Sequence, residues 1–273
     1  MATTNPSTAW RDDIDVTPHP PVGATVSGLD LDDLPPGAVD FLVEVLADHG
    51  VVIFTGQDID DAGFVRFLAR FGTLTFTRGE TPVQGHPDLN VVSNEGRTEP
   101  PRSSFHTDTS YVRQPPTYTA LRAVVLPERG GETLFTNQYR AFDTLPDHLK
   151  ATLDGRSATH VATGVDLGAG DESRADHRVF QRHPVSGRTT IYISTPQRCA
   201  TVSGMADADA RASIESLYLH CTAEDNIYRH AWSPGDVIMW DNRCVLHKAD
   251  HSGVDGIRTL HRGLVIARPG NGA

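Results

Sequence analysis

Two segments of this sequence carry side chains that can bind a metal ion. His106 and Asp108 lie in Phe105-His106-Thr107-Asp108, and residues i and i+2 of a β-strand point to the same face. An imidazole and a carboxylate on one face suit a divalent cation, although about one His-x-Asp is expected by chance. A second triplet, His86-Pro87-Asp88, lies in a Gly- and Pro-rich loop, and its proline argues against a central strand. It is therefore the weaker candidate.

His247 follows an apolar strand predicted at residues 236–240 and a polar turn. With His106 and Asp108 it would complete a set of two imidazoles and one carboxylate, which leaves three positions of the metal open. Such a set suits Fe(II) that binds a bidentate oxo-acid and O2. A lone distal histidine is more often structural, so His247 needs further support. A catalytic pair of Cys244 and His247 is disfavoured, because residues three apart on a strand point to opposite faces.

The support comes from a strand-like run that begins with Arg258 and continues to Arg262. An arginine inside a β-barrel requires an anionic partner, and a dicarboxylate cosubstrate can supply one through bidentate hydrogen bonds. Arg258 and Arg262 are four residues apart and therefore share a strand face. Two inward arginines predict two anionic groups, one on the cosubstrate and one on the substrate. The alternative for each is an ion pair with Asp or Glu of the chain.

The elements that must position these residues are mainly short strands. Many strands with a few helices predict a mainly β fold, a sandwich or jelly roll with helical insertions. We expect one domain over residues 1–273, with a flexible tail at 1–12, an active-site loop at 77–104 and a mobile polar insert at 163–178. Helices are expected at residues 39–49, 60–70, 138–154 (as a pair) and 206–222. Strands are expected at residues 51–54, 89–92, 105–112, 118–126, 132–136, 179–183, 189–194, 236–240 and 258–267.

Composition limits the classes of function. The net charge of −11 disfavours nucleic acid as a partner, since phosphate binding needs a basic surface. No apolar run approaches the ~20 residues of a membrane span, and the polar N-terminus lacks the apolar core of a signal peptide. The three widely spaced cysteines show no disulfide framework, which favours a reducing cytoplasm. A small anionic substrate remains compatible with an acidic protein, because it needs only one or two buried arginines.

Taken together, these segments resemble the taurine and 2,4-dichlorophenoxyacetate dioxygenase family. The resemblance rests on His106-Thr107-Asp108, on Gly130-Gly131-Glu132-Thr133-Leu134, on residues 240–243 up to His247, and on Arg258-Thr259-Leu260-His261-Arg262. Each motif is weak alone, but their order and spacing fit from about Gly50 to Ala267.

The resemblance implies a double-stranded β-helix, which is a jelly roll, with Fe(II) at one mouth. His106, Asp108 and His247 would be the metal ligands, and Thr133 and Arg258 would bind the distal carboxylate of 2-oxoglutarate. With O2 as the second cosubstrate, such an enzyme hydroxylates a small anionic molecule and releases succinate and CO2. The family's halogenating relatives lack the carboxylate ligand, so Asp108 disfavours halogenation. The family also implies a homo-oligomer, a dimer or a tetramer.

The substrate residues depart from the taurine enzyme. Arg262 lies where that enzyme binds the substrate sulfonate with an arginine, but Thr77 replaces a substrate-binding histidine. Arg102 lies about where the enzyme has an asparagine, and Gln197 and Arg198 lie near a family aromatic residue. Taurine itself is therefore disfavoured. If Arg102 and Arg198 face inward, the substrate carries more than one charge.

Two alternatives stay open. The first is a biosynthetic oxidase of the same family that desaturates or cyclises an amino-acid-like or phosphonate substrate. The second, from another class, is a metal-binding jelly-roll module without turnover, which would leave Thr133 and Arg258 unexplained.

Overall fold

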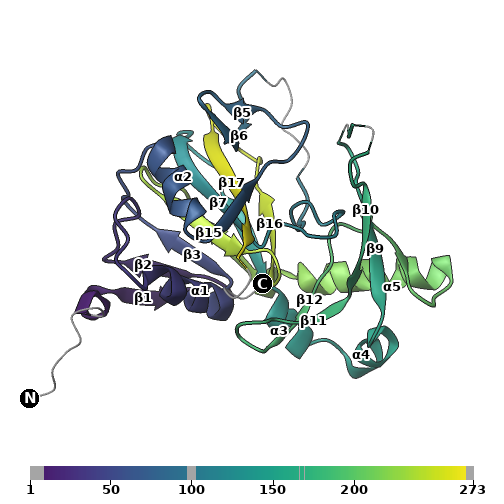
Figure 1. The fold of residues 1–273 in the computed structure, drawn as a ribbon. Coiled ribbons are helices and arrows are strands. Elements are labelled where there is room, and N and C mark those ends of the chain that lie inside the picture. The colour runs from purple at the N-terminus through teal and green to yellow at the C-terminus, as the bar shows by residue number, and fades with distance from the viewer. Residues whose placement is uncertain (1–8, 97–102, 166, 169, 269–273) are drawn as a thin grey trace, which may run out of the picture.

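A large β-sheet and a small β-sheet form the centre of the molecule. The computed structural model describes residues 9–96, 103–165, 167–168 and 170–268. The large sheet has the strand order β1-β2-β3-β15-β7-β17-β6-β5, with β4 also paired to β17, and the small sheet has the order β14-β8-β16 (Figure 1). The predicted mainly β jelly roll with helical insertions is confirmed.

The strands of the large sheet are β1 (Asp15–Pro18), β2 (Ala24–Ser27), β3 (Val51–Phe54), β4 (Gly72–Thr75), β5 (Pro82–Val83), β6 (His86–Ser93), β7 (Tyr118–Val125), β15 (Val237–Asp241) and β17 (Thr259–Ala267). Those of the small sheet are β8 (Thr133–Asn137), β14 (Ile227–His230) and β16 (Val245–Ala249).

The outer face of the large sheet is covered by α1 (Ala38–His49) and α2 (Asp61–Ala69). The side chain of Asp60 caps α2 by accepting a hydrogen bond from the amide of Gly63 at 2.7 Å. On β17 a glycine, Gly263, lets α2 approach, because a Cβ there would collide with Leu68. The two helices thereby seal one side of the sheet with apolar side chains.

The inner face of the large sheet packs on the small sheet. Leu260 of β17 and Trp240 of β15 share a buried core with Phe135 of β8, and the Phe135 and Trp240 ring centroids are 5.4 Å apart. Because side chains alternate along a strand, Arg258 and Arg262 point to the same inner side as Leu260. The two sheets therefore enclose the arginines that the sequence singled out.

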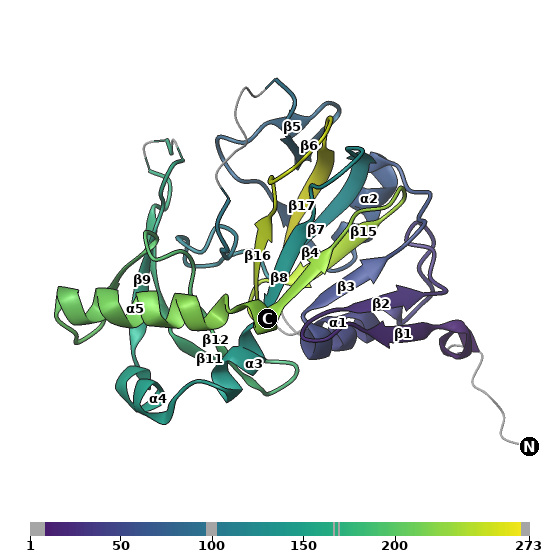
Figure 2. The same cartoon turned by 180° about the vertical axis from the view of Figure 1, so that it is seen from behind.

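An insertion between β8 and β14 forms a separate lobe beside the sandwich (Figures 1 and 2). Its apolar core, in which α5 (Asp207–Cys221) packs on β13, continues onto Leu134 of β8 and Leu246 of β16 in the small sheet. Its other elements are α3 (Gln138–Asp143), α4 (Asp147–Leu153), β9 (Ser157–Val161), β10 (Arg174–Arg178), β11 (Phe180–Arg182), β12 (Thr189–Ile191), β13 (Cys199–Val202) and the 3-10 helix η2 (Glu224–Asn226).

Three local predictions need correction. Residues 105–112 do not form a strand: His106 makes a single β-bridge, and turns follow it. The loop expected around His86-Pro87-Asp88 is instead the start of β6, whose pairing with β17 runs over Leu89–Ser93 and leaves Pro87 outside it. Of the predicted tail, residues 1–8 lie outside the described residues, and Ala9–Asp13 form the 3-10 helix η1. Long-range pairing with His247 places His106, whereas β6 begins by pairing with the neighbouring β5 (Val83 with His86).

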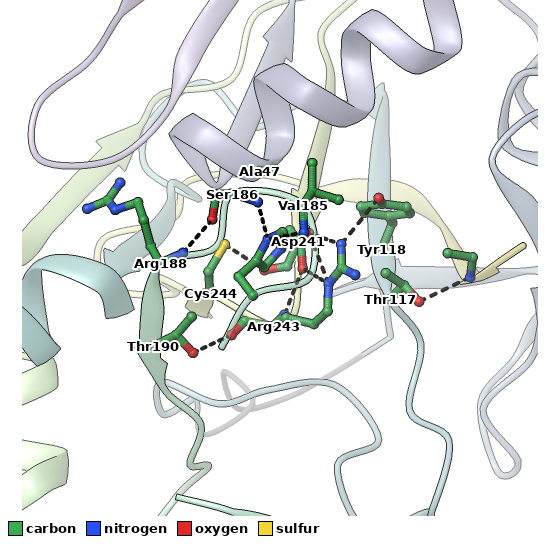
Figure 3. A network of polar contacts seen from close by, with 12 residues as sticks. Ala47, Thr117, Tyr118, Val185, Ser186, Arg188, Thr190, Asp241, Arg243 and Cys244 are labelled. Carbon is green, nitrogen blue, oxygen red and sulfur yellow. Dashed lines mark hydrogen bonds and ion pairs between the residues drawn. The ribbon is translucent and has the colours of Figure 1, made fainter. Parts of the chain in front are cut away.

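A buried ionic network joins the sandwich to the insertion (Figure 3). Asp241, at the end of β15, accepts hydrogen bonds from Nη2 of Arg243 at 2.6 Å and from Nε2 of His183 at 3.0 Å. Burial alone would raise the pKa of Asp241, but Arg243 and His183 more than offset it and hold the pKa below its usual range. The Asp241 carboxylate is fully buried and ionised, so it requires the hydrogen bonds from Arg243 and His183 to stabilise its negative charge.

We predict that Asp241→Asn lowers the free energy of unfolding by about 3–5 kcal/mol, because it leaves the buried Arg243 without its counter-ion. Urea denaturation followed by circular dichroism measures the change. The control is Glu224→Gln, which removes an exposed ion pair with Arg229 and should have little effect. Equal midpoints for the two variants would contradict the assignment of Asp241 as a structural counter-ion.

Candidate metal centre and its cavities

His106, Asp108 and His247 lie together between the two sheets. Their ligand atoms all lie within 4.8 Å of one another. Nε2 of His106 is 3.7 Å from Oδ1 of Asp108, and Nε2 of His247 is 3.6 Å from Oδ2. Two imidazoles and a carboxylate thus converge on one point, as a facial set of metal ligands would.

The protein backbone brings the three residues together without the strand predicted at 105–112. His247 lies on β16, and its amide and carbonyl exchange hydrogen bonds with those of His106 at 3.1 and 3.0 Å. The hydroxyl of Thr107 donates to the carbonyl of Ile193 at 2.9 Å, which ties the next residue to the insertion. Asp108 then reaches the same side as His106 from a turn whose next residue, Thr109, has a φ of 47°.

Neighbouring groups orient each ligand. Nδ1 of His106 lies 2.8 Å from the carbonyl of Ser104, so this nitrogen carries the proton and leaves Nε2 free to face Asp108. The hydroxyl of Thr119 donates to Oδ2 of Asp108 at 2.8 Å. Asn242 in turn donates to Thr119 at 2.8 Å. These contacts resemble the outer ligand sphere of known metal sites.

The charges in the cluster suit a cation. Burial would raise the pKa of Asp108, but His247, His106 and Arg262 together hold it well below its usual range. Burial lowers the pKa of His247 to about 3, so its ring is neutral near pH 7. A carboxylate with two imidazoles is a donor set that suits a divalent first-row metal, and the residues present therefore fit such an ion.

A second group of possible ligands, His183, Asp241 and Cys244, also lies within 4.8 Å. The guanidinium of Arg243 already donates hydrogen bonds to both oxygens of the Asp241 carboxylate, at 2.6 and 2.9 Å. Burial raises the pKa of the Cys244 thiol well above its usual value, so the thiol stays protonated. This group is a structural network, and it gives no support to catalysis by Cys244.

Arg258 is a buried cation without an anionic partner among the described residues. It is 2% exposed, and its side chain donates to the carbonyl of Gly131 at 2.7 Å and to the hydroxyl of Thr133 at 3.1 Å. Burial lowers its pKa to about 10, so it stays charged near pH 7. Gly131 has a φ of 78°, and a Cβ there would lie 2.8 Å from the Arg258 side chain. Arg258 therefore packs closely against Gly131, and its buried guanidinium remains available to bind an anion.

A small cavity opens beside the metal ligands, and we call it the polar cavity. It measures about 140 Å³ and is lined by His106, Asp108, Arg262, Arg198, Glu80 and Tyr111, among others. Nη1 of Arg262 is 3.6 Å from Oδ1 of Asp108. Any molecule in this cavity would therefore contact both the ligand cluster and two arginines.

An adjoining cavity of about 290 Å³ shares Thr77, Thr109 and Tyr111 with the polar cavity. The hydroxyls of Thr77 and Thr109 are 3.5 Å apart at this boundary. Apolar side chains such as Phe76 and Leu264 line its interior. A ligand with an anionic head and an apolar body can extend from one cavity into the other.

The structure gathers most, but not all, of the predicted site residues. Thr133 and Arg258 contact one another, and Thr77, Arg198 and Arg262 line the polar cavity. Gln197 is exposed and lines a different cavity together with Cys199, Asp207 and other residues. Arg102 lies outside the described residues.

Sequence reasoning did not assign six residues of the polar cavity: Glu80, Thr109, Tyr111, Thr163, Gly164 and Val165. Thr109 and Tyr111 directly follow the predicted ligand Asp108, so their proximity in sequence was an available signal. Glu80 lies in the segment after β4, where no spacing rule applies and only the folded structure reveals its position.

Comparison with known proteins adds independent information. The sequence model of the family described as "Taurine catabolism dioxygenase TauD, TfdA family" matches residues 14–264. An alpha-ketoglutarate-dependent (that is, 2-oxoglutarate-dependent) 2,4-dichlorophenoxyacetate dioxygenase of Cupriavidus pinatubonensis is 29% identical, over 91% of this chain and 96% of that protein. An alpha-ketoglutarate-dependent sulfate ester dioxygenase of Pseudomonas putida is 29% identical, over 84% and 81%.

Solved structures agree with the sequence comparison. A crystal structure of a taurine dioxygenase from Burkholderia xenovorans superposes with a TM-score of 0.81 at 29% identity. The match covers 96% of this chain and 94% of the other. The similarity therefore extends over nearly the whole chain.

We predict that Asp108→Ala weakens binding of Co(II) by more than about 100-fold, beyond the 10–100-fold effect of an orienting residue. Calorimetric titration of the metal-free protein measures it. Asp88→Ala, in the other His-x-Asp triplet, is the matched control and should bind as the wild type does. Unchanged binding by Asp108→Ala would show that the metal lies elsewhere.

Proposed function

The chain belongs to the taurine catabolism dioxygenase TauD, TfdA family, and we propose that it is an Fe(II)- and 2-oxoglutarate-dependent oxygenase. It oxidises a small anionic organic substrate with O2 and releases succinate and CO2. Relatives with this cosubstrate act, by their names, on a phenoxyacetate, on sulfonates and on sulfate esters. All of these are anions, which agrees with the arginines of the polar cavity.

The observation that carries the proposal is the buried guanidinium of Arg258. An isolated buried charge is costly, and among the described residues its hydrogen-bond partners are neutral. A carboxylate of 2-oxoglutarate would supply the missing charge through a bidentate contact, while the Thr133 hydroxyl, 3.1 Å from Nη2 of Arg258, adds a hydrogen bond. Trp232 donates to the same hydroxyl at 3.0 Å and fixes its direction.

His106, Asp108 and His247 would hold the iron, and they leave three positions for the cosubstrates. When bound, the iron supplies the oxidising chemistry, in which 2-oxoglutarate loses CO2 as O2 is reduced. Thr119 holds the Asp108 carboxylate in place. The ring of Trp240, whose centroid is 4.5 Å from that of His247, covers that ligand on the core side and keeps water away.

The polar cavity is the proposed substrate site. Arg262 and Arg198 would bind the anionic group, and Thr77 would line the path toward the adjoining cavity. Because the cavity touches His106 and Asp108, an anion there is held beside the metal, where oxidation takes place.

Several features stay predictions. These are the single domain over residues 1–273, a dimer or tetramer, a cytoplasmic location, and substrate roles for Arg102 and Gln197. Within the part of the chain that the structure describes, no helix is long and apolar enough to cross a membrane.

We predict that anaerobic addition of Fe(II) and 2-oxoglutarate produces a weak visible charge-transfer band that Arg258→Ala loses or weakens. The band weakens because Arg258→Ala removes the hydrogen-bonded ion pair with the distal carboxylate of 2-oxoglutarate. This loss should weaken 2-oxoglutarate binding at least about 10-fold. Absorption spectroscopy measures the band. Arg66→Ala, which removes an exposed arginine on α2, is the control.

Succinate release in air, with small anions as candidate substrates, completes this test. A metal-loaded protein that shows neither a band nor succinate would be a binding module without turnover, and the proposed activity would be wrong.

A further inference from the structure

Glu80 places a carboxylate in the polar cavity in addition to that of Asp108, the proposed metal ligand. Its Oε1 lies 3.4 Å from Nη2 of Arg262, whereas well-formed ion pairs elsewhere in this chain, such as Arg66 with Asp32, measure 2.6 Å. The Glu80 side chain is 40% exposed, but that of Arg262 is only 13% exposed. A carboxylate that is loosely held and close to solvent can leave the arginine at low cost, and a buried arginine cannot follow it.

Arg262 is poorly satisfied by its neighbours. Its second carboxylate contact, with Asp108, measures 3.6 Å and involves a proposed metal ligand. Its Nε is buried and has no hydrogen-bond partner among the described residues. The guanidinium therefore retains donors for an incoming anion.

Arg198 brings a second positive charge to the same cavity. Its described side-chain hydrogen bond goes to the hydroxyl of Thr163 at 3.3 Å, and it forms no ion pair with the carboxylates that the structure describes. Burial raises the pKa of Tyr111, which lines the cavity, and the charge of Arg198 opposes this rise. The charges of Glu80, Arg262 and Asp108 act on the same hydroxyl, so all of these side chains lie near Tyr111.

We propose that Glu80 occupies the place of the substrate's anionic group on Arg262, and that this group must displace it to bind between Arg262 and Arg198. Displacement leaves two guanidiniums to be neutralised, so the cavity selects a group with two negative charges, such as a phosphonate, over a monoanion of the same shape. This inference rests on the proposed function, because it assumes that the polar cavity holds the substrate.

The size of the cavity agrees with a compact head group. The polar cavity, at about 140 Å³, is smaller than the adjoining cavity of about 290 Å³, and charged and hydroxyl side chains dominate its lining. The carbon skeleton then extends past Thr77 and Thr109 into the adjoining cavity. Glu80 thereby acts as a specificity residue: every anion must displace it, and a dianion, which interacts more strongly with the two guanidiniums, does so more readily than a monoanion.

The test uses two probes with one carbon skeleton, ethylphosphonate and ethanesulfonate, at a pH where the phosphonate is a dianion. Calorimetry measures their binding to protein loaded with Fe(II) and 2-oxoglutarate without oxygen. We expect the wild type to bind the phosphonate about 10-fold more tightly. Glu80→Gln should bind both probes more tightly, and Arg198→Gln should lose most of the preference for the phosphonate.

Glu80→Asp serves as the second variant, since a shortened carboxylate keeps the charge and should behave more like the wild type than Glu80→Gln does. Glu224→Gln and Arg229→Gln, which break an exposed ion pair elsewhere, should leave both affinities unchanged. Unaltered or weaker binding by Glu80→Gln, or a phosphonate preference retained by Arg198→Gln, would overturn the proposal. The charge-transfer band recorded in the same samples reports separately on 2-oxoglutarate, so failure of either proposal is distinguishable.

Discussion

The structure depends on keeping two buried charges of opposite sign apart. Asp108 and Arg258 both lie inside the sandwich, and the charged or polar side chains near the Asp108 carboxylate are those of His106, His247 and Arg262, not that of Arg258. A direct ion pair between them would neutralise both charges, and neither side chain would then be available to bind a metal ion or an anion. The two sheets prevent it, because Arg258 packs against Gly131 and Thr133 while the β-bridge to β16 positions the His106–Asp108 segment. Space for ligands follows from this separation.

The sandwich and the peripheral segments have different tasks. The proposed metal ligands and Arg258 belong to or adjoin strands of the two sheets, where packing holds them rigidly. The polar cavity is completed by Glu80 and Thr77 from the segment after β4, and by Arg198 from the insertion between β8 and β14. Segments of this kind vary among relatives more readily than a sheet does. A fold arranged in this way can keep one chemistry while the substrate site changes.

The buried network around Asp241 serves the same geometry indirectly. Asp241 ends β15, directly before Asn242, which supports Asp108 through Thr119. Its partner His183 comes from the insertion, so one buried hydrogen bond joins the lobe that carries Arg198 to the sandwich that carries the proposed metal ligands. The contacts of Asp241 therefore support both the orientation of Asp108 and the position of Arg198 at the polar cavity.

From the sequence alone, local patterns determined the apolar helices α1, α2 and α5, the central strands β3, β7, β15 and β17, and the shared inward face of Arg258 and Arg262. Each follows from periodicity within one segment, and family resemblance added the three metal ligands and Thr133. Tertiary structure alone decided that His106 and Asp108 meet through a bridge to β16 and a turn instead of a strand, and that residues 86–88 begin β6. It also decided that Glu80 faces Arg262 and that Gln197 lines another cavity. The bridge of His106 to β16 depends on pairing between segments more than a hundred residues apart, whereas β6 begins by pairing with the neighbouring β5. The positions of Glu80 and Gln197 depend on loops without periodicity, and no local pattern encodes them.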